Sequence, residues 1–448
     1  MNIAISNGKF YIYDGAKLER IKEFNKDLDC AIKNITKKER LLKAKSMIMI
    51  NGKDNTVVAT YPIIRAQHYY PLSILDFAYA IKNVVCNKIP SLPILSLDSH
   101  DYNFCDFNCK DCLAVDTRNW AKDNLGFTNI APEEYEKVLY KIAQYSKKRG
   151  CDSIRFEMSG EGNPDMYPHR SRIMKYAKEV CNMQLVYISS GSLLTEQLID
   201  DLAKYADYVR ISLPGVTEVA YDIYSNQKYD KERRFTLQKA LKNIEKIIER
   251  RKFYGREGDL IVGARTCMRP ESDGGYLETA KKLKEIGADS FQVVQILVPE
   301  GSNYRDYPIS ESCKKELIDL NENKIGLMHI QTPSNLDYVY YDRGIEKENR
   351  PSECFSSMVA PILYGPHLVV CTHWEKIKNL QFHYGKIDDN VKEIEDIMQN
   401  ERAEHLRKDI PYNCSSCCSI FDNQIMSSIK AQLLLVKNPE DIEFLLTY

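Results

Sequence analysis

The sequence lacks any apolar run approaching the roughly 18 residues that can span a bilayer as a helix, so no membrane span is expected. It also lacks a basic block, since 62 Lys and Arg residues balance 63 Asp and Glu residues for a formal net charge of −1. Because clustered positive charge is what binds phosphate backbones, nucleic acid is not an expected partner. No secretory signal is recognisable, so the 14 cysteines favour the reducing cytoplasm, where thiols bind metals.

The length of 448 residues predicts two or three domains. Residues 1–90 are expected to form a small mixed α/β unit in which two Asn-Gly pairs mark hairpins. The expected elements of this unit are a hairpin over Ala4–Tyr13 around Asn7-Gly8, helical patterns across 17–46, a hairpin over Met47–Tyr61 around Asn51-Gly52, and a helix over Pro71–Val85. Pro90 and Pro93 bracket a linker into the next domain.

From residue 93, short β-rich runs alternate with long amphipathic helices. This alternation predicts an α/β fold with a parallel sheet, arranged as a partial (β/α)6 TIM-type barrel over residues 91–310. In such barrels the functional groups gather at the carboxyl ends of the strands. The expected strands are 94–98, 153–158, 184–189, 208–213, 260–266 and 290–297. The expected helices include 132–148, 169–181, 195–205, 233–251 and 275–286.

Three cysteines follow the first expected barrel strand in the run Cys105-Asp-Phe-Asn-Cys109-Lys-Asp-Cys112. This C-x3-C-x2-C spacing can give three thiolates to a [4Fe–4S] cluster and leave one iron open to a small molecule. Half of a zinc site is the alternative, but such sites usually add a second C-x-x-C pair or histidines. A disulfide framework suits short secreted chains better than this one.

Glycine- and serine-containing turns end the next three expected strands. They are Ser159-Gly160-Glu161-Gly162-Asn163-Pro164, Ser189-Ser190-Gly191-Ser192-Leu193-Leu194 and Ile211-Ser212-Leu213-Pro214-Gly215. Together with the cysteines, and in the same order over about 93–300, they resemble the radical S-adenosylmethionine (radical SAM) superfamily. The first turn resembles its GGEP element, the second its TNGTLL turn and the third its SLDG strand end.

This resemblance implies which residues hold S-adenosylmethionine. The first turn would hold the methionyl amino group, and a serine of the third would approach the ribose. Arg265, on the fifth expected strand, could reach the carboxylate or could be a barrel-lining ion-pair partner, and both interpretations stay open. The implied cofactor-binding residues are Ser159, Gly160, Glu161, Gly162, Asn163, Ser190, Ser212 and Arg265. No catalytic residue is assigned.

A second cysteine set comprises Cys354, Cys371, Cys414, Cys417 and Cys418. The first two flank a probable turn at Tyr364-Gly365-Pro366, and Cys414-Ser-Ser-Cys417 is a C-x-x-C pair. Four thiolates fit zinc or a second [4Fe–4S] cluster equally well. Residues 311–448 resemble the Twitch form of the SPASM domain, which implies an auxiliary [4Fe–4S] cluster bound by Cys354, Cys371, Cys414 and Cys417. Cys418 is then the spare thiol.

The resemblance also implies the reaction. An external one-electron donor of the flavodoxin or ferredoxin type reduces the first cluster, S-adenosylmethionine is cleaved reductively, and the resulting 5′-deoxyadenosyl radical abstracts hydrogen from an unactivated C–H bond. The favoured substrate of this oxidoreductase is a peptide recognised through residues 1–90. One alternative is a dehydrogenase or epimerase acting on a sugar or aminocyclitol. A non-catalytic iron–sulfur protein is the other, motivated by departures from the family pattern at Ser159, Ser190 and Pro214.

Overall fold

The structure is a computed structural model of the chain. It describes residues 2–6, 9–13, 18–20, 46–54, 56–62, 71–109, 112, 114–227, 234–269, 274–297, 307–327, 329–333, 336–337, 340–341, 354–370, 378–413 and 420–447. Within these ranges, no helix is both long enough and apolar enough to cross a membrane.

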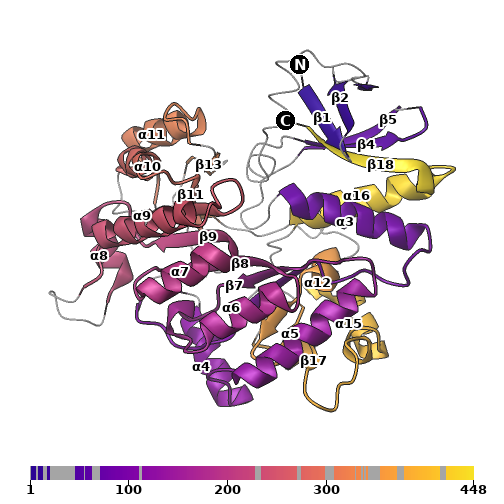
Figure 1. Cartoon of the computed structure of the whole chain (residues 1–448), viewed down its shortest axis with the longest axis horizontal. Helices are drawn as coiled ribbons and strands as arrows, with labels where there is room; N and C mark the ends of the chain where they lie inside the picture. Colours follow the sequence, from indigo (N-terminus) through magenta and orange to yellow (C-terminus); the bar gives the residue numbers. More distant parts are fainter. Residues whose placement is uncertain are drawn as a thin grey trace.

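Six parallel strands, neighbours in chain order, form the centre of a ten-stranded sheet (Figure 1). They are β6 (Ser96–His100), β7 (Arg155–Met158), β8 (Gln184–Ser189), β9 (Ala206–Leu213), β10 (Ile261–Cys267) and β11 (Ser290–Val294). The predicted α/β class and the predicted parallel sheet are therefore confirmed. The last predicted strand is shorter than expected, because Ile296–Leu297 form a separate strand, β12, paired with β14 (Tyr340–Tyr341).

Helices connect these strands and cover one face of the sheet (Figure 1). They are α4 (Ala114–Leu125), α5 (Pro132–Lys147), α6 (Arg170–Glu179), α7 (Glu196–Tyr205), α8 (Glu218–Ser225), α9 (Leu237–Phe253), α10 (Tyr276–Glu285) and α11 (Glu311–Asn321). Threonine caps three of them: the hydroxyls of Thr195, Thr217 and Thr236 each accept a backbone N–H three residues on. Each such cap is worth about 1 kcal/mol.

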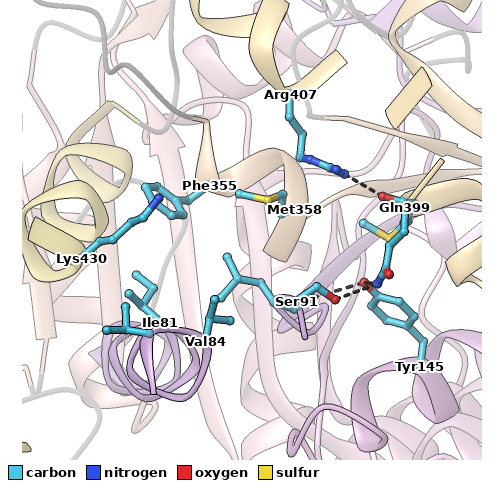
Figure 2. A pocket seen from close by; sticks show the side chains of 12 residues that line it. Ile81, Val84, Ser91, Tyr145, Phe355, Met358, Gln399, Arg407 and Lys430 are labelled. Atoms are coloured by element: carbon cyan, nitrogen blue, oxygen red, sulfur yellow. Dashed lines mark hydrogen bonds between the residues drawn. The ribbon is translucent and has the colours of Figure 1, made fainter. Parts of the chain in front are cut away.

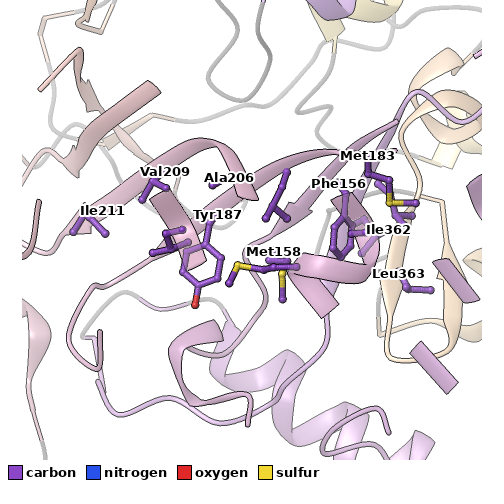
Figure 3. Packing of buried hydrophobic residues seen from close by; sticks show 14 of the residues in the cluster. Phe156, Met158, Met183, Tyr187, Ala206, Val209, Ile211, Ile362 and Leu363 are labelled. Carbon is purple, nitrogen blue, oxygen red and sulfur yellow. The ribbon is translucent and has the colours of Figure 1, made fainter. Parts of the chain in front are cut away.

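The main hydrophobic core lies between the sheet and these helices (Figure 3). Phe156 on β7, Tyr187 on β8 and Ile211 on β9 are fully buried there. Alternate residues of the same strands face the other side of the sheet, because side-chain direction alternates along a strand. That other side carries charged groups, as described below.

The sheet extends beyond the six predicted strands at both edges. β13 (His329–Gln331) adds in parallel to β11, and β15 (Ile362–Tyr364) adds in parallel to β6. The strands β16 (His367–Val369) and β17 (His383–Lys386) continue antiparallel from β15. The predicted turn between β15 and β16 is present, and Gly365 is required in it: its φ is +56°, and a Cβ there would stand 2.5 Å from the Phe127 ring.

A second, antiparallel sheet combines the two ends of the chain (Figure 1). Its order is β3 (Leu18–Arg20), β2 (Lys9–Tyr13), β1 (Asn2–Ser6), β18 (Ile442–Thr447), β4 (Ser46–Asn51) and β5 (Val57–Pro62). Helices α3 (Pro71–Val85) and α16 (Ile420–Leu435) pack against each other beside it. The ring of Phe444 on β18 meets that of Tyr79 on α3 edge-on, with the centroids 5.2 Å apart.

The N-terminal predictions can be compared with this sheet. The first hairpin and helix α3 are confirmed, with Ser6 opposite Lys9 across the predicted turn. The second hairpin forms, but its loop is longer than Asn51-Gly52, because Ile50 pairs with Val57. Leu18–Arg20 is a strand where a helical pattern was expected, and residues 21–45 lie outside the described residues. The domain limits 1–90, 91–310 and 311–448 stay a proposal, since the first and last of these ranges share one sheet.

Candidate functional site

The three cysteines of the first set lie on the loop that follows β6, at the carboxyl end of the parallel strands. Cys105, Cys109 and Cys112 are all free thiols of intermediate exposure. The loop turns tightly at its end, where the N–H of Cys112 donates to the Cys109 carbonyl at 3.2 Å. Phe107 is buried beneath it, and the N–H of Asn108 donates to Ser225 at the end of α8. The loop is therefore anchored to the barrel between the predicted ligands.

Burial favours the neutral thiols of Cys105 and Cys109. It raises the pKa of Cys105 to about 11 and that of Cys109 to about 12, so they would ionise only on binding a metal cation. Two cations offset the charge of the resulting thiolates. Arg118 Nη1 lies 4.0 Å from Cys112 Sγ, and the Arg269 guanidinium, stacked 4.2 Å from the Tyr224 ring centroid, acts to lower the pKa of Cys109.

Among the described residues, no three carboxylate, imidazole or thiol groups come together as ligands of a single metal ion.

The glycine turn after β7 packs directly against the cysteine loop. A Cβ on Gly162 would lie 2.3 Å from the carbonyl oxygens of both Tyr102 and Phe104, so only glycine fits. The N–H of Asn163 donates to the Phe104 carbonyl at 2.8 Å. Gly160 has a φ of +70°, which also favours glycine. The backbone of the glycine turn is thus in contact with the cysteine loop at Phe104, the residue before Cys105.

A polar network joins the cysteine loop to the turns after β7 and β8. The Asn163 amide contacts Asp106 Oδ1 at 2.7 Å, Ser190 Oγ at 3.0 Å and Ser192 Oγ at 3.1 Å. Ser192 Oγ donates to Asp106 Oδ2 at 2.5 Å. The structure therefore brings the predicted residues Asn163 and Ser190 together. Sequence reasoning missed Asp106 and Ser192, and the one signal for Asp106 is its place between two predicted ligands.

Glu161, predicted to hold the methionyl amino group, lies in a buried acidic cluster. His100 stands between two carboxylates, with Nδ1 3.5 Å from Glu161 Oε1 and Nε2 3.6 Å from Asp98 Oδ2. Burial opposes a charge on His100, but the carboxylates of Asp98, Glu161 and Asp101 outweigh it and raise its pKa to about 8. Burial raises the pKa of Glu161 and takes that of Asp101 to about 7. Ser159, another predicted residue, donates to Asp98 at 2.5 Å.

The second oxygen of Glu161 is the clearest indication of a ligand. Oε2 is buried and accepts no hydrogen bond from the described residues. A buried carboxylate oxygen without a partner is costly unless a cation binds it. An ammonium group would satisfy it, so this position fits the amino group of S-adenosylmethionine.

Ser212 and Arg265 lie side by side, in register on β9 and β10. Burial and Asp98 raise the pKa of Glu157 on β7, whereas Arg155, Arg210 and Arg265 act to lower it. Arg265 is thus close enough to Glu157 to belong to the charged lining of the barrel. Its role as a ligand of the S-adenosylmethionine carboxylate, and that of Ser212 at the ribose, stay predictions.

The second cysteine set is described only at Cys354, which is buried at the start of α12 (Phe355–Val359). Cys371, Cys414, Cys417 and Cys418 lie outside the described residues, so the auxiliary cluster stays a proposal. The hairpin between Cys354 and Cys371 does contact the first site. Its Tyr364 hydroxyl donates to Asn103 at 3.0 Å, two residues before Cys105, and the Gly365 N–H donates to the His100 carbonyl.

Comparison with known proteins gives one family and several distant structures. The family model of the Radical SAM superfamily matches residues 100–308. No curated protein matches the chain. The structure of Streptococcus suis SuiB bound to precursor peptide SuiA is similar at a TM-score of 0.48 and 13% identity, covering 73% of this chain and 69% of that one.

Two further solved structures are also similar only at low sequence identity. AnSMEcpe with bound AdoMet and Cp18Cys peptide gives a TM-score of 0.47 and 13% identity, over 76% of this chain and 97% of that one. BtrN in complex with AdoMet and 2-DOIA gives 0.32 and 11%, over 71% and 87%. At this level of similarity the neighbours identify neither a substrate nor site residues.

Proposed function

We propose that the protein is a radical SAM enzyme that abstracts hydrogen from an unactivated C–H bond of a peptide, since the Radical SAM family model matches residues 100–308. The observation that carries the proposal is the contact of Gly162 and Asn163 with the loop of the three free cysteines. This contact fixes the carboxylate of Glu161 relative to the thiols, in a buried site where electrostatic interactions are strong.

We assign a separate role to each group of site residues. Cys105, Cys109 and Cys112 would hold a [4Fe–4S] cluster, and the open oxygen of Glu161 would receive the amino group of S-adenosylmethionine. When bound, the two cofactors supply a 5′-deoxyadenosyl radical. His100 keeps Glu161 in place, and the network of Asp106, Asn163, Ser190 and Ser192 holds the surrounding turns. This chain thus orients the cofactors and excludes water.

A peptide is the favoured substrate because the antiparallel sheet can extend by one strand. β5 is the last strand in the order of that sheet, and the backbone groups along such an edge pair readily with an extended segment. Pro62 ends β5, so an added strand would pair with Val57–Tyr61.

A small polar metabolite is the second candidate, favoured by the charged lining of the barrel. Arg155 Nη2 and Glu157 Oε2 are 3.6 Å apart there, beside Arg210 and Arg265. Groups of both signs could bind the hydroxyl and amino groups of a sugar or aminocyclitol.

The proposal is tested by anaerobic reconstitution with iron and sulfide, followed by dithionite and S-adenosylmethionine. Wild type should form 5′-deoxyadenosine, and Cys109→Ala should form none. Cys313→Ala, which removes a buried thiol of the core on α11, is the matched control and should keep the activity. Product formation by the Cys109 variant would refute the site, and iron without product in wild type would favour a non-catalytic protein.

A further inference from the structure

A cavity of about 250 Å³ lies away from the cysteine loop, where three parts of the chain meet (Figure 2). Its walls come from α3 and α16 beside the antiparallel sheet, from α5 of the barrel, and from α12, α14 (Glu395–Met398) and α15 (Glu401–Asn413) of the C-terminal segment. Phe355, directly after Cys354, is one of the lining residues. A ligand here would touch all three parts at once.

The walls of this cavity differ in character (Figure 2). Ile81 and Val84 on α3 and Phe355 and Met358 on α12 make an apolar side. On the other side Gln399 is already engaged within the protein: its Nε2 donates to Ser91 Oγ at 2.7 Å. The hydrogen-bonded polar side therefore fixes the shape of the cavity. The apolar side provides the surface against which a ligand would bury its own apolar groups.

Two cations also line the cavity, and none of the described residues that line it is acidic. Arg407 is fixed by a hydrogen bond from Nη1 to the Met398 carbonyl at 2.7 Å. Lys430 Nζ lies 5.7 Å from the centre of the Phe355 ring, over its face. A guanidinium held by one of its five N–H donors can still bind a carboxylate with the others. The balance of charge in the cavity thus favours an anionic group beside an apolar one.

We propose that this cavity binds a large apolar side chain of a peptide together with the carboxylate next to it, such as an acidic neighbour or the C-terminal group. The volume fits one such residue and is below the roughly 300–1,000 Å³ of sites that enclose a whole drug-sized ligand. The assignment to a peptide rests on the proposed function. The preference for an apolar group beside a carboxylate rests on the cavity alone. The cavity and the proposed function can therefore be tested separately.

The test uses the reconstituted full-length enzyme and two probes, N-acetyl-L-phenylalanine and its amide, with dissociation constants measured by calorimetry. The acid should bind about tenfold more tightly than the amide, because only the acid can accept a charge-assisted hydrogen bond. Arg407→Gln and Lys430→Gln should each remove most of this preference. Arg402→Gln is the matched control on α15, since Arg402 donates instead to the Leu380 carbonyl and does not line the cavity.

Filling the cavity is the second arm. Met358→Trp should abolish binding of both probes, while 5′-deoxyadenosine formation without a probe stays at the wild-type level in all cavity variants. Equal affinity for acid and amide would overturn the inference, as would unchanged binding in Met358→Trp or in both cation variants. If the acid preference holds and wild type forms no 5′-deoxyadenosine, the proposed function fails and the cavity assignment stands.

Discussion

The two large sheets of this protein are held together by different kinds of connection. In the ten-stranded sheet, β6 to β11 are joined by local strand–helix–strand crossovers, so each strand pairs with its predecessor. In the six-stranded sheet, β18 from the end of the chain pairs with β1 on one side and β4 on the other. The barrel can therefore form from successive segments, whereas the smaller sheet is complete only when both ends of the chain have met.

We propose that this difference separates chemistry from substrate recognition. The cysteine loop, the turn of Glu161 and the network around Asp106 all belong to the locally connected sheet. The edge strand β5 and two of the helices that line the cavity, α3 and α16, belong with the sheet that joins the chain ends. Damage to one sheet should therefore leave the function of the other largely intact, and the following predictions test that separation.

The largest effect is expected from removing a buried ring in either sheet. Phe444→Ala on β18 and Phe156→Ala on β7 each delete a side chain that is at most 1% exposed, at a cost of about 3–5 kcal/mol. Hydrogen exchange followed segment by segment should show loss of protection in β1, β4 and β18 for the first variant, with normal iron content. The second should lose iron instead. Parallel loss of protection in both sheets for either variant would contradict the separation.

Gly162→Ala should come next, because the new Cβ would stand 2.3 Å from two carbonyl oxygens of the cysteine loop. The turn must move, at a cost of about 1–3 kcal/mol, and Glu161 moves with it. The affinity for S-adenosylmethionine, measured by equilibrium dialysis, should fall about tenfold. Gly255→Ala is the control, since the Cβ added there meets no atom within 4 Å and only the strain of its positive φ remains. An equal loss in both variants would rule out the contact as the cause.

His100→Gln should change how stability depends on pH. The folded-state pKa of about 8 exceeds the ordinary value of 6.5, so the bound proton stabilises the protein below pH 6.5, and this contribution is lost as the pH rises through about 8. The full effect is about 2 kcal/mol. The unfolding midpoint of wild type should fall between pH 6.5 and 8.5 more steeply than that of the variant. Identical slopes would mean that Asp98 and Glu161 do not hold a charged imidazole.

The smallest effect is expected at the spare cysteine. Cys418→Ala should leave the iron content nearly unchanged, whereas Cys417→Ala should remove about half of it by preventing the proposed auxiliary cluster from binding. Iron and sulfide analysis of the two variants in parallel decides between them. The reverse pattern would assign the ligand role to Cys418.

The same contrast between local and distant connections explains what the sequence could predict. The barrel strands begin within two residues of their expected starts, because hydrophobic periodicity and turn residues act over a few positions. Nothing within Ile442–Thr447 indicates that it pairs with β1 and β4, and strands as short as β13 and β15 carry too few residues for a periodic signal.

In the candidate site, too, local patterns could be predicted from the sequence and distant contacts could not. The spacing of Cys105, Cys109 and Cys112 and the glycine turn are short patterns whose chemistry is visible in the residues themselves. Asp106, His100 and Ser192 are ordinary polar residues in the sequence, and their roles depend on partners that other strands bring to them.

We propose that two separate cysteine sets hold iron, and that the first holds the cluster for radical chemistry. The most direct measurement is the iron and sulfide content of the anaerobically reconstituted wild type and of a variant with Cys105, Cys109 and Cys112 all replaced by Ala. We expect about eight irons in wild type and about four in the variant, which should form no 5′-deoxyadenosine. Equal iron content in the two proteins would contradict this proposal.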